Sequence, residues 1–153
     1  MSVDVGSKAP DFAMATDTGK ARLSDFAGKT VVLYFYPKDD TPGCTNEGKA
    51  FSALLPQFQK AGAVVIGASK DSVKSHAKFR AKYGLAIELG SDPEGAVIQA
   101  YGSWVEKSMY GRQYMGIDRS TFLIDGSGVV RAIWRKVKVS GHAEAVLQAA
   151  QAI

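Results

Sequence analysis

Cysteine is the residue that this sequence most nearly lacks, because Cys44 is the only one among 153 residues. A lone cysteine excludes a disulfide within the chain, a CxxC redox pair and a zinc site built from several cysteines. Any chemistry at Cys44 therefore takes place without a partner thiol in its own chain.

Long apolar runs are also missing. No stretch approaches the roughly 18 consecutive apolar residues of a membrane span, and the opening MSVDVGSKAP has no apolar signal core. We therefore expect a cytoplasmic protein that does not bind a membrane. The 46% apolar content suffices for a sizeable core, which favours one domain over residues 1–153.

Charge of one sign is not concentrated anywhere along the chain. The net charge of +4 is dispersed, and the densest basic group is a loose cluster of Arg131, Arg135, Lys136 and Lys138. This is a weak signal for a polyanion partner, so no nucleic acid is expected. The sequence also has no glycine-rich phosphate-binding loop.

Candidate metal ligands and bases are sparse. Asp39 and Asp40 precede a Pro-Gly turn and are expected to face solvent, without a third ligand at suitable spacing. His76 and His142 fall on separate predicted helices, where surface or capping roles are expected. We predict neither a metal nor an organic cofactor. Asp17, at the start of Asp-Thr-Gly, is interpreted as part of a hairpin turn.

Alternating strand and helix patterns fill the first half of the chain. Residues 30–36 (TVVLYFY) and 63–69 (AVVIGAS) are β-branched and aromatic runs, typical of strands buried on both faces. Between them, apolar spacing predicts a helix over about residues 44–60. A second helix is expected from a cap at Asp71 to about Tyr83.

The second half of the chain also contains both helix and strand patterns. Ser91 or Asp92, followed by Pro93, predicts the start of a short helix that ends near Gly102. The segments STFLID and VVRAIWR flank a turn at residues 126–128 and predict a β-hairpin. A last helix places four apolar residues on one face: Ala143, Val146, Leu147 and Ala150. The expected fold is α/β, thioredoxin-like, with a central mixed β-sheet flanked by helices on both faces.

The position of Cys44 in the first turn of a predicted helix is chemically suggestive. Free backbone N–H groups and the positive end of the helix dipole favour an anionic sulfur there. Lowering a thiol pKa from about 8.5 by two units requires about 2.7 kcal/mol. A helix end supplies only about 0.3–1 kcal/mol, so a cation must assist. From location alone, the competing interpretation is an inert core cysteine.

The neighbouring residues favour the reactive interpretation. YPKDDTPGCTNE resembles the active-site segment of peroxiredoxins, whose Pro-x-x-x-Thr-x-x-Cys pattern fits Pro37, Thr41 and Cys44. It is most similar to the peroxiredoxin Q group, also called bacterioferritin comigratory proteins, in which PKDDTPGCT is a typical run. The resemblance covers nearly the whole chain, in the order VGSKAPDF, IGASKDSVKSHAKF, SDPEG, KSMYG, YMGIDRSTFLID and GHAEAVL.

This resemblance implies roles for particular residues. Cys44 would be the peroxidatic cysteine, Thr41 would orient the peroxide, and Pro37 would shield the thiolate from water. The backbone N–H groups of Cys44 and Gly43 would meet the peroxide.

Two charged residues complete the implied site. Arg119, in IDRSTF, matches the active-site arginine of the family and would supply the missing cation, because a guanidinium keeps its charge and donates several hydrogen bonds. Glu47 matches an acidic residue that positions this arginine. The implied activity is reduction of hydrogen peroxide and organic hydroperoxides, with Cys44 becoming a sulfenic acid.

The chain departs from the family pattern at the resolving cysteine. Many peroxiredoxin Q members carry that thiol five residues after the first cysteine or in the following helix, where this chain has Lys49 and, approximately, Arg80. The sulfenic acid of Cys44 is therefore expected to react with an external thiol: thioredoxin, glutaredoxin or glutathione. The alternatives are a peroxide-responsive redox sensor or a disulfide exchanger. We expect a monomer or a weak homodimer.

Overall fold

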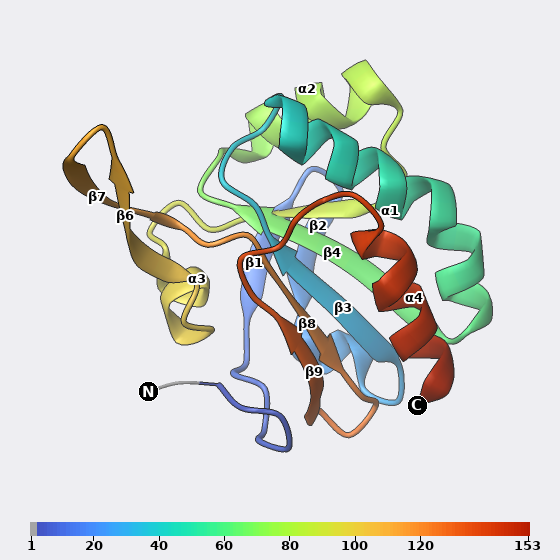
Figure 1. The fold of residues 1–153 in the computed structure, drawn as a ribbon. Helices are drawn as coiled ribbons and strands as arrows, with labels where there is room; N and C mark the ends of the chain where they lie inside the picture. Colours follow the sequence, from blue (N-terminus) through green and yellow to red (C-terminus); the bar gives the residue numbers. More distant parts are fainter. Residues whose placement is uncertain (1–2) are drawn as a thin grey trace.

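The computed structural model describes residues 3–153, and one mixed β-sheet runs through its centre (Figure 1). Seven strands of the described chain form this sheet, in the spatial order β2-β1-β5-β4-β3-β8-β9. Their bounds are β1 Ala13–Thr16, β2 Gly19–Arg22, β3 Thr30–Phe35, β4 Ala63–Ser69, β5 Glu88–Ser91, β8 Ser120–Ile124 and β9 Val130–Trp134. Strands β3, β4 and β5 are parallel, and the outer pairs are antiparallel.

Helices cover both faces of the sheet, as predicted. In Figure 1 the longer helices lie against one face and a short helix lies on the other. The longer helices are α1 (Pro42–Lys60), α2 (Val73–Tyr83) and α4 (His142–Ala152). The other face carries α3 (Ala96–Ala100), and a 3₁₀ turn, η1 (Leu23–Phe26), follows β2. Among the described helices, none is both long and apolar enough to cross a bilayer.

The sheet separates two apolar clusters, and β3 contributes to both because its side chains alternate between the two faces. Val32 and Tyr34 pack into the cluster under α1, α2 and α4, whereas Leu33 and Phe35 pack into the cluster on the α3 side. Burial of both faces explains the continuous apolar run of this segment and confirms its assignment as an inner strand.

The helices and strands predicted from the sequence are present in the structure, some of them with shifted ends. The segment at residues 63–69 is β4, and the segments around residues 126–128 form the β8–β9 hairpin. The turn at Asp17 joins β1 to β2. The predicted apolar face of α4 is buried at all four positions, Ala143, Val146, Leu147 and Ala150.

Two predicted helix starts are wrong. Helix α2 is capped by Ser72, whose Oγ accepts the Ser75 N–H at 3.1 Å, because the Asp71 carboxylate is occupied by Ser69 Oγ and the Asp39 N–H. Helix α3 begins only at Ala96. The residues that follow Asp92 form a turn instead of a helix. Gly95 (φ 75°) is in the left-handed conformation directly before the helix begins.

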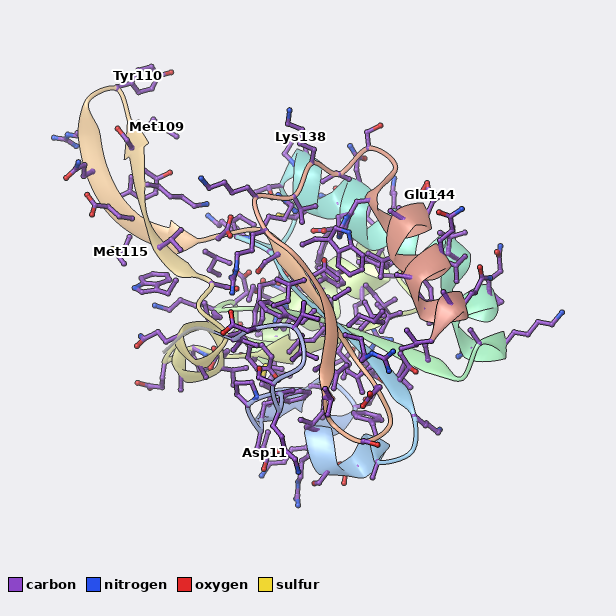
Figure 2. The ribbon with its side chains drawn as sticks, turned by 60° about the horizontal axis from the view of Figure 1, so that its bottom comes forward. Asp11, Met109, Tyr110, Met115, Lys138 and Glu144 are labelled. Carbon is purple, nitrogen blue, oxygen red and sulfur yellow. The ribbon has the colours of Figure 1, made fainter. Side chains whose placement is uncertain are left out.

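One element was not foreseen. Strands β6 (Trp104–Met109) and β7 (Arg112–Ile117) pair in a separate hairpin that projects from the body of the protein (Figure 1). Its two-residue turn places both Tyr110 (φ 52°) and Gly111 (φ 77°) in the left-handed region. Figure 2 shows Met109 and Tyr110 at the tip, where Tyr110 is 99% exposed.

Candidate active site

Cys44 lies in the first turn of α1, as predicted, directly beyond the loop that leaves β3. Pro42 opens the helix, which suits a residue that has no N–H to satisfy. Thr41 is the N-cap, with extended backbone geometry, and its carbonyl accepts the Thr45 N–H at 2.8 Å. The Cys44 side chain is only 2% exposed. The helix thus holds the sulfur beneath the surface, close to unpaired backbone donors.

A cation that can assist the helix start in stabilising a Cys44 thiolate is present. Arg119 lies in the link between β7 and β8, and its Nη2 donates a hydrogen bond to Cys44 Sγ at 3.3 Å. Its Nη1 donates to Glu47 Oε1 at 2.7 Å. Burial lowers the pKa of Arg119, but the adjacent Glu47 and Cys44 outweigh this effect and leave it above the ordinary value. The guanidinium therefore stays charged beside the sulfur.

Glu47 lies one helical turn after Cys44 and is 1% exposed. Burial raises the pKa of its carboxyl to about 7, against the opposing effect of Arg119. Only Oε1 is paired, because Oε2 has no hydrogen-bond partner among the described residues. Glu47 is therefore an incompletely compensated acid that changes protonation near neutral pH.

The Gly43 backbone lies close to the Arg119 guanidinium. A Cβ at this position would lie 3.1 Å from Arg119 Nη2, so a side chain would press on the guanidinium that contacts the sulfur. As the second residue of α1, Gly43 also has a backbone N–H without a partner inside the helix.

The other predicted site residues lie in the preceding loop. Thr41 is half-buried, and its hydroxyl donates to the Lys38 carbonyl at 2.8 Å, which leaves its oxygen free to accept. Pro37 follows the last residues of β3 and is exposed. The described contacts join Cys44, Arg119, Glu47 and Gly43 directly, whereas Thr41 and Pro37 belong to the loop that leads to them.

Both histidines are buried, so their predicted surface or capping roles are wrong. His142 is 7% exposed, and its Nε2 lies 2.7 Å from the Thr121 hydroxyl. Burial and the positive charge of Arg119 lower the pKa of His142 to about 4, which keeps it neutral. His76 is fully buried against Asp39.

The prediction of solvent-facing acids holds for one of the pair only. Asp40 is exposed and binds Lys82 Nζ at 2.8 Å. Asp39 is buried, because the loop turns its carboxylate inward toward α2. Sequence reasoning missed this contact, since Asp39 and His76 are 37 positions apart and no local pattern joins them.

The two positions predicted to lack a resolving thiol hold anchored cations. Lys49 Nζ lies 5.1 Å from the centre of the Tyr83 ring. Arg80 Nη1 donates to both carboxylate oxygens of Asp17, at 2.6 and 2.8 Å.

A thiol buried in a first helical turn, with a permanent cation on the sulfur, defines an enzyme that acts through one activated cysteine. The sheet and helix arrangement supports the site from β3, α1 and the β7–β8 link. Comparison with known proteins identifies the family to which this enzyme belongs.

A sequence model of the AhpC/TSA family matches residues 5–133. Peroxiredoxin Bcp of Xanthomonas campestris is 58% identical over 130 residues, covering 85% of this chain and 81% of the relative. Peroxiredoxin Bcp of Bacillus subtilis is 46% identical over 149 residues, covering 97% and 95%. The solved structure of Xanthomonas campestris peroxiredoxin Q superposes with a TM-score of 0.90 at 50% identity, covering 98% of this chain and 96% of that one.

The chain belongs to the AhpC/TSA family, as a one-cysteine member of its peroxiredoxin Q (Bcp) group, and is a thiol-dependent peroxidase with the thioredoxin-like fold. The Xanthomonas protein has been solved with a serine in place of either of two cysteines that lie 36 residues apart. The same spacing counted from Cys44 falls on Arg80.

Proposed function

We propose that this protein reduces hydrogen peroxide and organic hydroperoxides in the cytoplasm, through a sulfenic acid on Cys44 that an external thiol resolves. The proposal includes one catalytic domain over the whole chain, acting as a monomer or a weak homodimer. The observation that carries it is the 3.3 Å hydrogen bond from Arg119 to the sulfur in the first turn of α1. A structural relative, the Xanthomonas protein, is described by its alkyl peroxide reduction activity, which supports organic peroxides as substrates.

In the first step the Cys44 thiolate attacks one peroxide oxygen in line with the O–O bond. That bond breaks, the second oxygen leaves as hydroxide or alkoxide, and a proton from solvent converts it to water or alcohol. Sulfur is oxidised to the sulfenic acid and the peroxide is reduced. Negative charge moves from sulfur to the leaving oxygen, so groups that stabilise both positions accelerate the step.

Each neighbouring group has a part in this charge movement. Arg119 donates to sulfur before attack and has further N–H groups for the peroxide oxygens. The N–H groups of Gly43 and Cys44 favour negative charge at the helix start. The Thr41 hydroxyl oxygen accepts a hydrogen bond from the peroxide O–H and so orients the substrate.

Glu47 and Pro37 support the site indirectly. Glu47 fixes the guanidinium through the 2.7 Å hydrogen bond to Nη1. Pro37 stiffens the start of the loop, because its ring fixes the backbone φ angle, and limits access of water to the sulfur.

Resolution requires a thiol from another molecule. The external thiolate attacks the sulfenic sulfur, the S–O bond breaks, and hydroxide leaves and takes a proton from solvent to become water. The product is a mixed disulfide, which a second thiol then reduces to release Cys44. We propose glutathione, glutaredoxin or thioredoxin as the source. Because Cys44 is 2% exposed, the first turn of α1 must open before a bulky reductant reaches the sulfur.

The test is steady-state peroxide reduction by the full chain, supplied separately with thioredoxin and its reductase or with glutathione, glutaredoxin and glutathione reductase. We expect multiple turnovers with at least one system, and none from Cys44→Ser. Equal turnover by Cys44→Ser would overturn the proposal. A single stoichiometric oxidation that no reductant reverses would instead favour the redox-sensor alternative.

A further inference from the structure

A buried polar cluster lies behind the loop that carries Thr41, and the proposed mechanism does not use it. Its centre is the Asp39 carboxylate, which accepts hydrogen bonds from Tyr36 Oη at 2.6 Å and Ser75 Oγ at 2.7 Å. His76 Nδ1 lies 2.8 Å from Asp39 Oδ2. Asp39 is 7% exposed and His76 is 0% exposed, and a surface pocket reaches the Asp39 side of the cluster.

The two ring nitrogens of His76 both face oxygens that accept. Nδ1 faces the Asp39 carboxylate at 2.8 Å and is farther, 3.3 Å, from Tyr36 Oη, which already donates to Asp39 Oδ1. Nε2 lies 3.1 Å from the Gly90 carbonyl oxygen of β5. A neutral imidazole donates from one nitrogen only, so its other lone pair would meet an oxygen lone pair in a buried site. A doubly protonated ring satisfies both contacts.

The partner carboxylate has the opposite charge. Burial raises the pKa of Asp39, but hydrogen bonds from His76, Tyr36 and Ser75 outweigh it and hold the pKa below the ordinary value. Two other titratable groups lie close to the ring. Tyr36 Oη is 3.3 Å from His76 Nδ1. Asp71 is the second, since one side-chain atom from each of Asp39, Asp71 and His76 lies within 4.8 Å of the others.

Hydrogen-bond donors already occupy these acids. Asp71 Oδ2 accepts the Asp39 N–H at 2.9 Å and Ser69 Oγ at 2.6 Å. The cluster therefore joins the catalytic loop to α2 and β5 through the 2.8 Å contact of Asp39 with His76, which is an ion pair when the ring is protonated.

The location of Asp39 connects this ion pair to the reaction. Asp39 lies two residues before Thr41, in the loop between β3 and α1. Next to it, Asp40 adopts φ 59°, in the left-handed region that aspartate enters more readily than most residues. Asp39 is the loop residue with a buried anchor on both its N–H and its carboxylate.

We infer that His76 is a positioning residue for peroxide reduction: its doubly protonated ring holds Asp39, and through Asp39 it holds the loop that presents the Thr41 hydroxyl. This inference rests on the proposed function. Arg119 reaches Cys44 from the β7–β8 link, independently of this loop. Loss of the ion pair should therefore impair the orientation of peroxide and leave the reactivity of the thiol itself intact.

The first test is nuclear magnetic resonance of the wild-type chain labelled with ¹⁵N in histidine. At pH 7 we expect both His76 nitrogens to have the chemical shifts of protonated imidazolium, with His142 as the neutral internal comparison. A pyridine-type shift at either His76 nitrogen would overturn the inference, whatever the variants do.

The second test compares two single-turnover reactions of Cys44, oxidation by hydrogen peroxide and alkylation by iodoacetamide. For His76→Gln and Asp39→Asn we expect the peroxide rate constant to fall about tenfold or more, since small misplacement of reacting groups is costly. Alkylation, which does not use Thr41, should change less than about twofold by the same reasoning. Asp125→Asn, in the distant β8–β9 turn, is the matched control and should change neither rate.

The outcomes separate this inference from the proposed function. A wild-type chain that fails to react with peroxide contradicts the proposed function. A wild-type chain that reacts normally, with variants that match it or lose both rates in parallel, contradicts the positioning role of His76 alone.

Discussion

Two buried acid–base pairs flank the catalytic loop, and they are built differently. Glu47 and Arg119 lie on the Cys44 side, where one carboxylate oxygen is unpaired and burial raises the pKa of Glu47 to about 7. Asp39 and His76 lie on the α2 side, where both carboxylate oxygens accept hydrogen bonds and the pKa of Asp39 is below its ordinary value.

The difference separates a reactive pair from an anchoring pair. A carboxylate that is incompletely hydrogen-bonded in a buried site leaves its guanidinium partner free to bind other groups, here the sulfur and the incoming peroxide. A carboxylate with every oxygen engaged has no spare capacity and serves to fix the backbone. The pair on the Cys44 side of the loop thus takes part in the reaction, and the pair on the α2 side holds the loop in place.

The largest expected effect comes from removing the reactive cation. Arg119→Met should lower kcat/KM for hydrogen peroxide by about 100- to 1,000-fold, because a donor aimed at the developing charge is lost. It also leaves Glu47 buried without its partner, which should destabilise the fold by about 3–5 kcal/mol unless Glu47 takes up a proton. Stopped-flow oxidation and urea unfolding measure the two effects. Arg131→Met, which breaks an exposed pair with Asp125, is the matched control and should change neither.

The raised pKa of Glu47 predicts an unusual pH dependence. The folded protein binds this proton more tightly than the unfolded chain, so stability is greatest below the unfolded pKa near 4.5 and falls as pH rises to about 7. The loss should be about 3 kcal/mol, and Glu47→Gln should abolish it. Urea midpoints for both proteins between pH 4 and 8 provide the measurement. Parallel curves would show that Glu47 is not the group responsible.

The anchoring pair should respond in the opposite direction and by less. Because the pKa of Asp39 is lowered, its stabilisation is present above the unfolded pKa near 3.9 and is lost as pH falls through the folded value. Asp39→Asn should cost about 1–3 kcal/mol at pH 7 and show a flatter acid limb than wild type. Acid unfolding followed by circular dichroism tests this. An unchanged acid limb would mean that Asp39 is not ionised in the folded state.

The two pairs also differ in how far sequence reasoning reached them. Arg119 and Glu47 were expected because the residues around Cys44 and the IDRSTF segment resemble a family with a known arrangement. Asp39 and His76 were assigned to the surface, because an acid before a turn and a histidine on a polar helix usually lie there. Their burial depends on where the loop meets α2, which is a tertiary property.

The fold shows the same division between local and tertiary information. The runs that became β3 and β4 are apolar on both faces, and this pattern alone identifies inner strands. The cap of α2 depended on competing partners for the Asp71 carboxylate. Helix α3 starts later than local preference indicates, although the Asp92 carboxylate still accepts the Ile98 N–H of its first turn. The β6–β7 hairpin uses Tyr110 in a left-handed position, which weakens the usual turn signal.

The most direct measurement is mass spectrometry of the intact chain after rapid mixing with one equivalent of hydrogen peroxide, followed by glutathione. The account predicts one added oxygen, located on Cys44 by a sulfenic-acid probe, and then its replacement by a single glutathione in a mixed disulfide. Peroxide consumption that leaves Cys44 unmodified at both stages would contradict it.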